Sequence, residues 1–243
     1  MCDNLLILGA SSEVAAALIP EISNKVQKIY AHYYQSGERL RSIQKEVSCE
    51  MELLQADFTD EEDTKALIRK VAESGTNITH ILHCPSARIE NRRFQKLGWE
   101  EYAQMLYTQL RSLYYAAAQF VPQMTKQRRG KIVSILSSCT VGTPPPYLNA
   151  YVTAKYAQLG FIRSLAAELA DKSIQINAVS PGMMETRFVS GMSHLVVEKS
   201  ASEHPLNRNA TVGDVVPVVK FLLSEQSDFI TGQNILVSGG SLI

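Results

Sequence analysis

The sequence predicts an α/β fold: a single doubly wound domain in which a parallel sheet of seven strands lies between helices. Short runs that are apolar throughout alternate with longer amphipathic runs along the whole chain. Strands without a polar face are typical of a parallel sheet that is covered on both sides. No linker rich in Pro, Gly or Ser and no internal repeat divides the 243 residues, so we expect residues 1–243 to form one domain.

The half at about 1–130 is predicted to contain four strands and four helices. "NLLILGA" (4–10) predicts the first strand, and "SEVAAALIPEIS" (12–23) predicts the helix after it. The run at 60–74 opens with acidic residues, which are favourable at a helix N-terminus. The other elements expected here are strands at 26–34, 49–58 and 78–84 and helices at about 38–48 and 99–125.

The half at about 131–243 continues the alternation. Its expected elements are strands at 130–138, 174–182 and 234–240 and helices at 150–170 and 211–224. Residues 183–210 form the one long irregular region. Because ligands of such sheets bind beyond the carboxyl ends of the strands, we expect this segment to act as a lid.

The composition excludes several classes of function. Lysine plus arginine equals aspartate plus glutamate, at 24 each, which argues against broad nucleic-acid binding. No apolar run approaches the roughly 18 residues that a membrane span needs, and the N-terminus has no basic segment of a signal peptide. Cys2, Cys49, Cys84 and Cys139 lack CxxC spacing, and the five histidines form no ligand pattern. We therefore expect a cytoplasmic protein with reduced thiols and no metal.

The strongest chemical signal is "AYVTAKYA", in which Tyr151 and Lys155 are four residues apart. On a helix the two side chains lie on one face, about one turn apart. A nearby ammonium lowers the pKa of a tyrosine hydroxyl, which is ordinarily near 10, and the pair could then exchange a proton with a carbonyl or alcohol oxygen. A packed tyrosine beside a solvated lysine is the other interpretation of the same spacing. Ser137 and Ser138 end the fifth strand just before this helix, where a hydroxyl could bond the same substrate oxygen.

The order of these motifs resembles the short-chain dehydrogenase/reductase family, most closely its 3-oxoacyl-acyl-carrier-protein reductase members. The resemblance covers essentially the whole chain and includes "ILGASS" (7–12), "QADFTD" (55–60), "GKIVSILSS", "YVTAK", "INAVSPGMMETRF" (176–188) and "FLLSEQSDFITGQNILVSGG" (221–240). It implies a Rossmann-like fold and an NAD(P)-dependent oxidoreductase.

The resemblance also implies roles for the catalytic residues. Tyr151 would be the general acid in reduction, and Lys155 would lower its pKa and hold the nicotinamide ribose. A serine would polarise the carbonyl: counting along the strand from Gly130 favours Ser137, whereas the family's spacing back from Tyr151 favours Ser138. Gln109 stands where the family has its active-site asparagine, either supporting a shifted water relay to the lysine or serving as an ordinary helix residue.

The first turn departs from the family pattern. Gly9 keeps the glycine of the tight turn, and Ala15 replaces another glycine with the next smallest side chain. Glu13 replaces a glycine at the N-terminus of a helix, where the cofactor phosphates also belong. If Glu13 points to solvent, its backbone can still line the phosphate site; if it points inward, it repels the cofactor. We expect a weakened but usable site.

The end of the second strand bears on the choice of cofactor. NAD-dependent members place an acid there to hold the ribose 2′-OH, but "AHYYQSGER" has no acid before Glu38, so we expect NADP(H) rather than NAD(H). "HCPS" (83–86) replaces the family's Asn-Asn-Ala-Gly, which makes His83 mainly a structural residue. The residues that the resemblance places around the cofactor are Gly9, Ser11, Ser12, Glu13, Val14, Tyr33, Ser36, Asp57, Phe58, His83, Lys155, Pro181, Gly182 and Thr186.

Three functional hypotheses follow. The first is an NADP-dependent carbonyl reductase, with a 3-oxoacyl thioester on a carrier protein as one substrate. Arg128 and Lys172 align with family residues that receive the acidic carrier, although a solvated basic turn is the alternative. The second is a dehydrogenase or reductase of a free small molecule, and the third is a non-catalytic dinucleotide-binding relative. The apolar helices at 99–125 and 150–170 need covering on two sides, and with the resemblance they predict a homotetramer.

Overall fold

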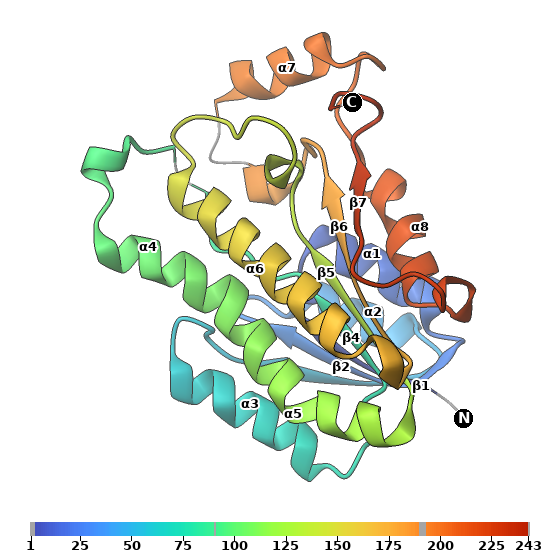
Figure 1. Ribbon diagram of the computed structural model, residues 1–243. Helices are drawn as coiled ribbons and strands as arrows, with labels where there is room; N and C mark the ends of the chain where they lie inside the picture. Colours follow the sequence, from blue (N-terminus) through green and yellow to red (C-terminus); the bar gives the residue numbers. More distant parts are fainter. Residues whose placement is uncertain (1–2, 90, 190–192, 243) are drawn as a thin grey trace.

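Seven parallel strands form one sheet in the order β3-β2-β1-β4-β5-β6-β7 in the computed structural model. The structure describes residues 3–89, 91–189 and 193–242 (Figure 1), so Cys2 and part of the expected lid lie outside the described residues. The strand order reverses between β1 and β4, which is the position where open α/β sheets bind ligands. The strands are β1 (Asp3–Leu8), β2 (Val26–Tyr33), β3 (Glu50–Gln55), β4 (His80–His83), β5 (Gly130–Ile135), β6 (Ile174–Pro181) and β7 (Asn234–Val237).

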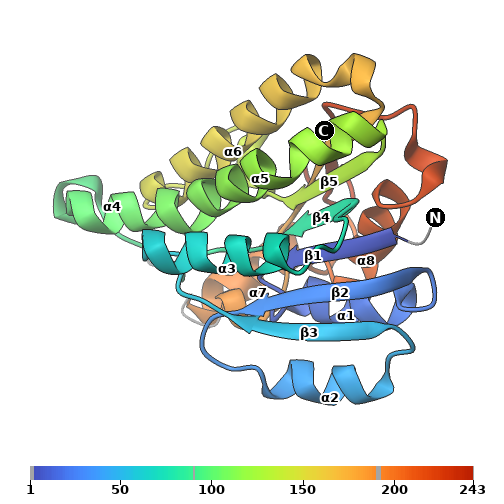
Figure 2. The ribbon, with the colours of Figure 1, turned by 90° about the horizontal axis from the view of Figure 1, so that it is seen from below.

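The helices cover both faces of the sheet, as Figure 2 shows. One layer contains α3, α4, α5 and α6, and the other contains α1, α2 and α8. Their bounds are α1 (Glu13–Ile22), α2 (Glu38–Glu46), α3 (Glu61–Glu73), α4 (Trp99–Leu106), α5 (Ser112–Gln127), α6 (Asn149–Glu168), α7 (His194–Glu203) and α8 (Val212–Leu222). The architecture that the sequence predicts is therefore confirmed.

The central strand β1 shows why its sequence is apolar throughout. Successive side chains of a strand point to opposite faces. Leu6 and Leu8 are buried in the core beneath α3, α5 and α6, whereas Leu5 and Ile7 are buried in the core beneath α1, α2 and α8. Because both faces of β1 are buried over residues 5–8, none of these positions is suited to a polar side chain.

The single helix expected at 99–125 is interrupted. A π-helical turn at Tyr107–Arg111 separates α4 from α5. The helical pattern of apolar residues continues through this turn, so the sequence gives no sign of the extra residue. π-Turns inside α-helices occur frequently at functional sites.

The region 183–210 is less irregular than the sequence suggests, because it contains α7. None of the residues of α7 is buried, and without a buried face the helix has no apolar stripe from which it could be recognised. The segment after α7 docks on the C-terminal residues, since His204 Nε2 lies 2.7 Å from the carbonyl oxygen of Ser238. Figure 1 shows α7 beside the C-terminus. Within the part of the chain that the structure describes, no helix has the length and apolar character of a membrane span.

Candidate active site

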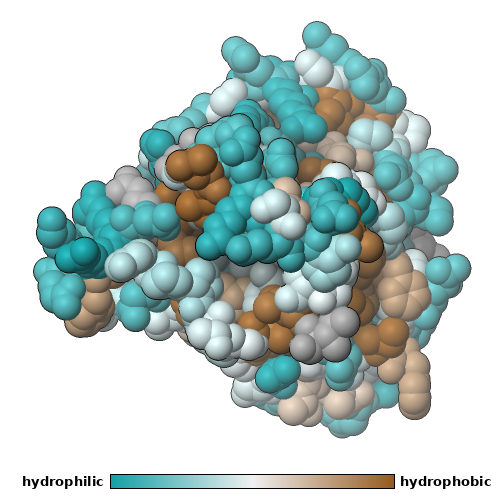
Figure 3. All heavy atoms as spheres, turned by 90° about the horizontal axis from the view of Figure 1, so that it is seen from above, coloured by the Kyte–Doolittle hydropathy of each residue, from teal (hydrophilic) through white to brown (hydrophobic). Residues whose placement is uncertain are grey.

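Four neighbouring strands end at one edge of the sheet, and the segments that follow them form the candidate site. β1 ends at Leu8, β4 at His83, β5 at Ile135 and β6 at Pro181. These strands are adjacent and parallel, so the loops after them gather on the same side. Figure 3 views the molecule from above the orientation of Figure 1 and shows small hydrophobic areas between hydrophilic ones.

Tyr151 and Lys155 lie buried on the first turns of α6, with exposed fractions of 7% and 2%. The Lys155 ammonium is 5.7 Å from the centroid of the Tyr151 ring and donates a hydrogen bond of 2.9 Å to the carbonyl oxygen of Ile135 at the end of β5. This bond fixes the lysine against the sheet. The two residues thus share one face of the helix, at the carboxyl edge of the sheet.

Ser137 is the serine that the structure brings to the tyrosine. Its hydroxyl is hydrogen-bonded to the Tyr151 side chain and accepts a bond of 3.3 Å from the backbone N–H of Cys139. Ser138 begins the short turn at Ser138–Thr140, where its carbonyl oxygen accepts from the N–H of Val141. The hydroxyl of Ser137 is therefore placed to reach a substrate oxygen together with Tyr151.

Burial governs the ionisation of both groups. It raises the pKa of Tyr151, and the nearby Cys139 raises it further, whereas the hydrogen bond with Ser137 lowers it. Burial also lowers the pKa of Lys155 to about 8, since a charged group is unfavourable in a medium of low polarity. On balance the pKa of Tyr151 lies above its ordinary value, because burial outweighs the hydrogen bond with Ser137; the expected effect of Lys155 on this pKa stays a prediction.

A cavity of about 270 Å³ opens beside Tyr151. Its walls come from residues in the segments 87–92, 97–105 and 147–151. A larger hollow of about 1190 Å³ lies at the opposite edge of the sheet, where Asp3, Lys25 and Lys131 are among the lining residues. Because Tyr151 and Lys155 are remote from that edge, the smaller cavity is the candidate substrate site.

Gln109 lies fully buried inside the π-helical turn. Its side-chain nitrogen is 3.5 Å from the sulfur of Met105, which lines the cavity beside Tyr151. Its side-chain oxygen has no hydrogen-bond partner among the described residues, and its backbone oxygen accepts from Gln158 Nε2 at 3.1 Å. The structure thus places Gln109 near the site, with an acceptor that a buried water could satisfy.

His83 is fully buried in a polar network beneath the site. Gln158 Nε2 donates to its Nδ1 at 3.2 Å, so Nδ1 is an acceptor and Nε2 carries the hydrogen. Nε2 then donates to Ser112 Oγ at 2.9 Å, and Ser112 Oγ donates to the carbonyl oxygen of Thr108 at 2.7 Å. Burial and the charge of Lys155 hold the pKa of His83 well below its usual range. The neutral ring joins β4 to α5 and α6, and Ser112 and Gln158 in turn bond backbone oxygens of the π-helical turn. Both nitrogens of the ring are engaged within the protein.

The first turn after β1 has the geometry of a phosphate-binding loop. Gly9 has a φ of +74°, and a Cβ there would come within 2.8 Å of the backbone nitrogen of Pro85. Ser12 caps α1 by accepting from the N–H of Ala15 at 3.2 Å, and Val14 packs into the core. The first N–H groups of a helix have no partner within it and favour an anion. This turn therefore fits the diphosphate of a dinucleotide, with the hydroxyls of Ser11 and Ser12 at the same end of α1.

A test of this turn is the substitution Gly9→Ala. We expect it to lower the free energy of unfolding by about 2–3 kcal/mol, because a positive φ and the contact with Pro85 both disfavour a side chain. Urea unfolding followed by circular dichroism measures the change. Gly75→Ala is the matched control, since Gly75 has a φ of +70° and open space around the added Cβ. Equal losses for the two variants would contradict a steric role of Pro85.

Glu13 points neither freely to solvent nor into the loop. Its Oε1 accepts a hydrogen bond of 3.1 Å from the backbone N–H of Arg187 and lies 3.5 Å from the Nε atom of the same residue. The Glu13 side chain is 22% exposed. The carboxylate is thus turned towards the segment that follows β6.

His32, which no motif of the sequence singles out, joins β2 to Gly9 and to Ala56 after β3. Its Nδ1 accepts from the N–H of Gly9 at 3.0 Å, and its Nε2 therefore donates to the carbonyl oxygen of Ala56 at 3.1 Å. Burial lowers the pKa of His32 to about 4, so the ring is neutral. A histidine near the end of the otherwise apolar and aromatic run "IYAHYY" was the signal available in the sequence.

Phe58 lies under His32 rather than at the surface. The two rings stack with centroids 3.9 Å apart, and Phe58 is buried in the core. Phe58, one of the residues expected around the cofactor, thus supports His32 from within the core.

Asp57 follows β3 and is partly exposed. Its Oδ1 accepts from the hydroxyl and the N–H of Thr59, at 2.7 and 2.8 Å. Partial burial opposes ionisation, but these bonds prevail and lower the pKa of Asp57. Tyr33 packs over Gly37, and Ser36 is exposed. The loop between β2 and α2 thus carries exposed polar groups and no acid.

The segment after β6 is held by backbone bonds. Pro181 ends β6, and the N–H of Gly182 donates to the carbonyl oxygen of Val237 at 2.9 Å. The N–H of Thr186 donates to the carbonyl oxygen of Met184 at 2.9 Å, and Met184 bridges to Ala210. The next residue, Arg187, is the one that contacts Glu13.

Arg128 and Lys172 lie together, but not beside Tyr151. Arg128 donates to the carbonyl oxygen of Asp171 at 2.9 Å, and the ammonium of Lys172 is 2.7 Å from the Asp171 carboxylate. They precede β5 and β6 and so belong to the amino-terminal edge of the sheet. Within one chain they lie at the edge opposite the candidate site around Tyr151.

Comparisons with known proteins agree with this fold. A family model described as enoyl-(acyl carrier protein) reductase matches residues 9–241. The 3-oxoacyl-[acyl-carrier-protein] reductase FabG of Staphylococcus aureus is 26% identical over 245 residues, which cover 99% of this chain and 98% of FabG. The solved structure of ElxO with NADP bound has a TM-score of 0.86 and 26% identity, covering 100% of this chain and 99% of ElxO. A 3-oxoacyl-[acyl-carrier-protein] reductase from Brucella melitensis with bound NAD has a TM-score of 0.86, covers 99% of this chain and 91% of that one, and at 22% identity supports the fold alone.

Proposed function

The chain belongs to the short-chain dehydrogenase/reductase family of oxidoreductases, and from this premise we propose that it reduces a carbonyl group to an alcohol with NADPH. The observation that carries the proposal is the buried set of Ser137, Tyr151 and Lys155 beside a cavity. The Tyr151 and Ser137 hydroxyls are hydrogen-bonded to each other. Two such donors stabilise a carbonyl oxygen that gains negative charge during reduction.

Each of the three residues has a distinct task in this proposal. The Tyr151 hydroxyl donates a proton to the carbonyl oxygen as that oxygen becomes an alcohol. The Ser137 hydroxyl donates a hydrogen bond to the same oxygen and orients the substrate. Lys155, held by the carbonyl of Ile135, keeps its ammonium close to the tyrosine ring and would hold the nicotinamide ribose. Bound NADPH would supply the hydride.

The residues around the carboxyl edge would hold the dinucleotide. Gly9, Ser11, Ser12 and the first N–H groups of α1 would hold the diphosphate, and Asp57 would contact the adenine. The segment Pro181, Gly182 and Thr186 would flank the nicotinamide end. The exposed loop around Ser36 carries no acid, so it leaves room for a 2′-phosphate; this supports NADP(H) over NAD(H).

Two substrate classes remain, each supported by an observation. The names of the similar reductases support a 3-oxoacyl thioester on a carrier protein. The cavity of about 270 Å³ beside Tyr151 supports a free small molecule, since it lies just below the usual size of drug-like sites. Docking of a carrier on Arg128 and Lys172 would require these residues to act from a neighbouring copy of the chain.

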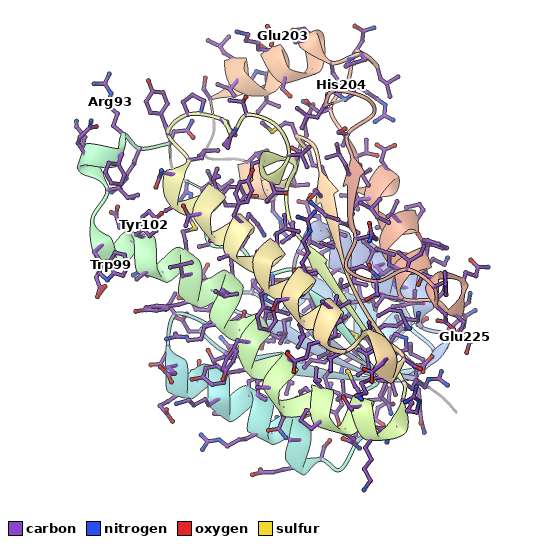
Figure 4. All side chains as sticks on the ribbon, in the orientation of Figure 1. Arg93, Trp99, Tyr102, Glu203, His204 and Glu225 are labelled. Carbon is purple, nitrogen blue, oxygen red and sulfur yellow. The ribbon has the colours of Figure 1, made fainter. Side chains whose placement is uncertain are left out.

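A homotetramer, which we also propose, would supply such a neighbour. Trp99 on α4 and Tyr114 on α5 are 72% and 52% exposed, and Tyr102 stacks with Trp99 at a centroid distance of 5.9 Å. Figure 4 shows Trp99 and Tyr102 close together on α4. Exposed aromatic side chains of this size are typical of protein interfaces.

The direct test is titration of the purified protein with NADPH and with NADH, followed by the fluorescence of the reduced nicotinamide. We expect micromolar affinity for NADPH and weaker affinity for NADH. Oxidation of NADPH is then measured with a 3-oxoacyl thioester on acyl carrier protein and with the matching free thioester of N-acetylcysteamine. Faster turnover of the carrier-bound form would support the first substrate class, and equal or faster turnover of the free form the second. Absence of binding by either nucleotide would refute the proposed function.

A further inference from the structure

One ion pair connects the phosphate-binding turn to the segment after β6. Glu13 and Arg187 are 174 positions apart in the chain, yet the Glu13 carboxylate accepts the Arg187 N–H and lies 3.5 Å from its Nε. The Nη2 atom of Arg187 also lies 3.5 Å from the carbonyl oxygen of Ser11. The guanidinium thus faces both the start of α1 and the turn before it.

The charge of Glu13 requires such a partner if the turn is to bind a diphosphate. A helix N-terminus favours one negative group, and Glu13 already supplies one on the first turn of α1. A diphosphate in the same place would meet a carboxylate of like charge, a contact that costs binding free energy. The Arg187 side chain is 70% exposed, and its guanidinium offsets the charge of Glu13 and presents a positive group to the turn.

We propose that Arg187 is a cofactor-positioning residue that makes the Glu13-bearing turn competent to bind the diphosphate of NADP(H). The carboxylate holds the guanidinium over the turn, and through the backbone N–H it also anchors the segment that contains Thr186. This inference rests on the proposed function, because it concerns the same dinucleotide.

A double-mutant cycle tests the coupling. NADPH affinity is measured by nicotinamide fluorescence for the native protein, Glu13→Gly, Arg187→Ala and the double variant. We expect Arg187→Ala to weaken binding about tenfold, since it leaves the carboxylate uncompensated. Glu13→Gly alone should change affinity by less than about threefold, because the loss of the carboxylate also frees the arginine. In the Arg187→Ala background, Glu13→Gly should restore most of the lost affinity.

The cycle distinguishes a coupled pair from two independent charges. If Glu13→Gly improves binding by the same factor in both backgrounds, the two side chains act independently and the inference is overturned. Lys220→Ala is the matched control: Lys220 pairs with Glu21 at 2.9 Å, near the other end of α1. This variant should bind NADPH like the native protein.

A second measurement needs no cofactor. Hydrogen–deuterium exchange of peptides covering 183–189 should be faster in Glu13→Ala than in the native protein, because the Arg187 N–H loses its acceptor. Unchanged exchange would overturn the anchoring part of the inference. A native protein that binds neither nucleotide would refute the proposed function itself, whereas normal NADPH binding by Arg187→Ala would refute only the role of this arginine.

Discussion

Replacing Tyr151 by phenylalanine is expected to lower kcat by a factor of about 10²–10⁴, the usual contribution of a general acid, while NADPH affinity stays unchanged. The ring is buried, and phenylalanine fills the same space apart from the hydroxyl. The hydrogen bond with Ser137 is lost, but the turn at Gly9 and the start of α1 are not altered. Steady-state kinetics and nicotinamide fluorescence measure the two quantities on the same preparation.

Tyr156→Phe provides the control for this substitution. Tyr156 lies on the same helix, but it is 43% exposed, so the loss of its hydroxyl should leave kcat within about twofold of the native value. A Tyr151→Phe protein with native turnover would show that another group donates the proton. Loss of NADPH binding in the same variant would show instead that the hydroxyl supports the cofactor site.

The substitution Lys155→Met is expected to have effects of opposite sign on turnover and stability. Turnover should fall below detection, because the ammonium beside Tyr151 is lost. At pH 7 the free energy of unfolding should rise by about 2 kcal/mol, since methionine removes the cost of burying a charge and the unpaired carbonyl of Ile135 cancels only part of this gain. Urea unfolding at pH 7 measures the difference.

The shifted pKa of Lys155 makes the stability of the protein depend on pH. The folded-state pKa of Lys155 is about 8, below the ordinary value of 10.5, so between these two values the unfolded chain binds more protons than the folded protein. The free energy of unfolding therefore rises as the pH increases from about 8 to about 10.5. Below pH 8 the folded protein bears the full cost of burying the charged ammonium. The advantage of Lys155→Met should accordingly shrink as the pH is raised towards 10. An advantage that does not change with pH would mean that Lys155 is not the titrating group.

Lys131→Met separates this effect from the general removal of a buried lysine. Lys131 is also buried, but its ammonium is 2.6 Å from the Asp228 carboxylate. Methionine there removes an ion pair as well as a desolvated charge, so we expect a loss of stability or no change. A gain as large as that of Lys155→Met would contradict this interpretation.

The sequence predicts the sheet well because a doubly covered parallel sheet leaves a strong pattern. Short apolar runs such as "NLLIL", separated by helices of the right length, are typical of the buried strands of a parallel sheet. The helix α7 and the π-helical turn were not predicted, for different reasons. α7 has no buried residue and hence no apolar stripe, whereas the turn at Tyr107–Arg111 keeps the stripe of its neighbours.

The site was predictable where a motif fixes spacing along one element, and less so where distant segments meet. Tyr151 and Lys155 share a helix, so their proximity follows from helix geometry. The contact of Glu13 with Arg187 joins α1 to the segment after β6, and no local pattern reports it. His32 was missed for the same reason, because its partners, Gly9 and Ala56, belong to other segments of the chain. Burial raises the pKa of Tyr151, and the spacing of Tyr151 and Lys155 does not reveal that burial.

The bonding of His83 has a consequence for how this protein could diverge from relatives with asparagine at that position. An asparagine amide ends about where the Nδ1 atom of the ring lies, so it could meet Gln158 but could not also reach Ser112. Exchanging position 83 alone would remove the bond that Ser112 Oγ accepts and leave it only its bond to the Thr108 carbonyl, at a cost of about 0.5–1.5 kcal/mol. The fitness effect of a substitution at position 83 would therefore depend on which residue occupies position 112, so natural selection would act on these two positions as an epistatic pair.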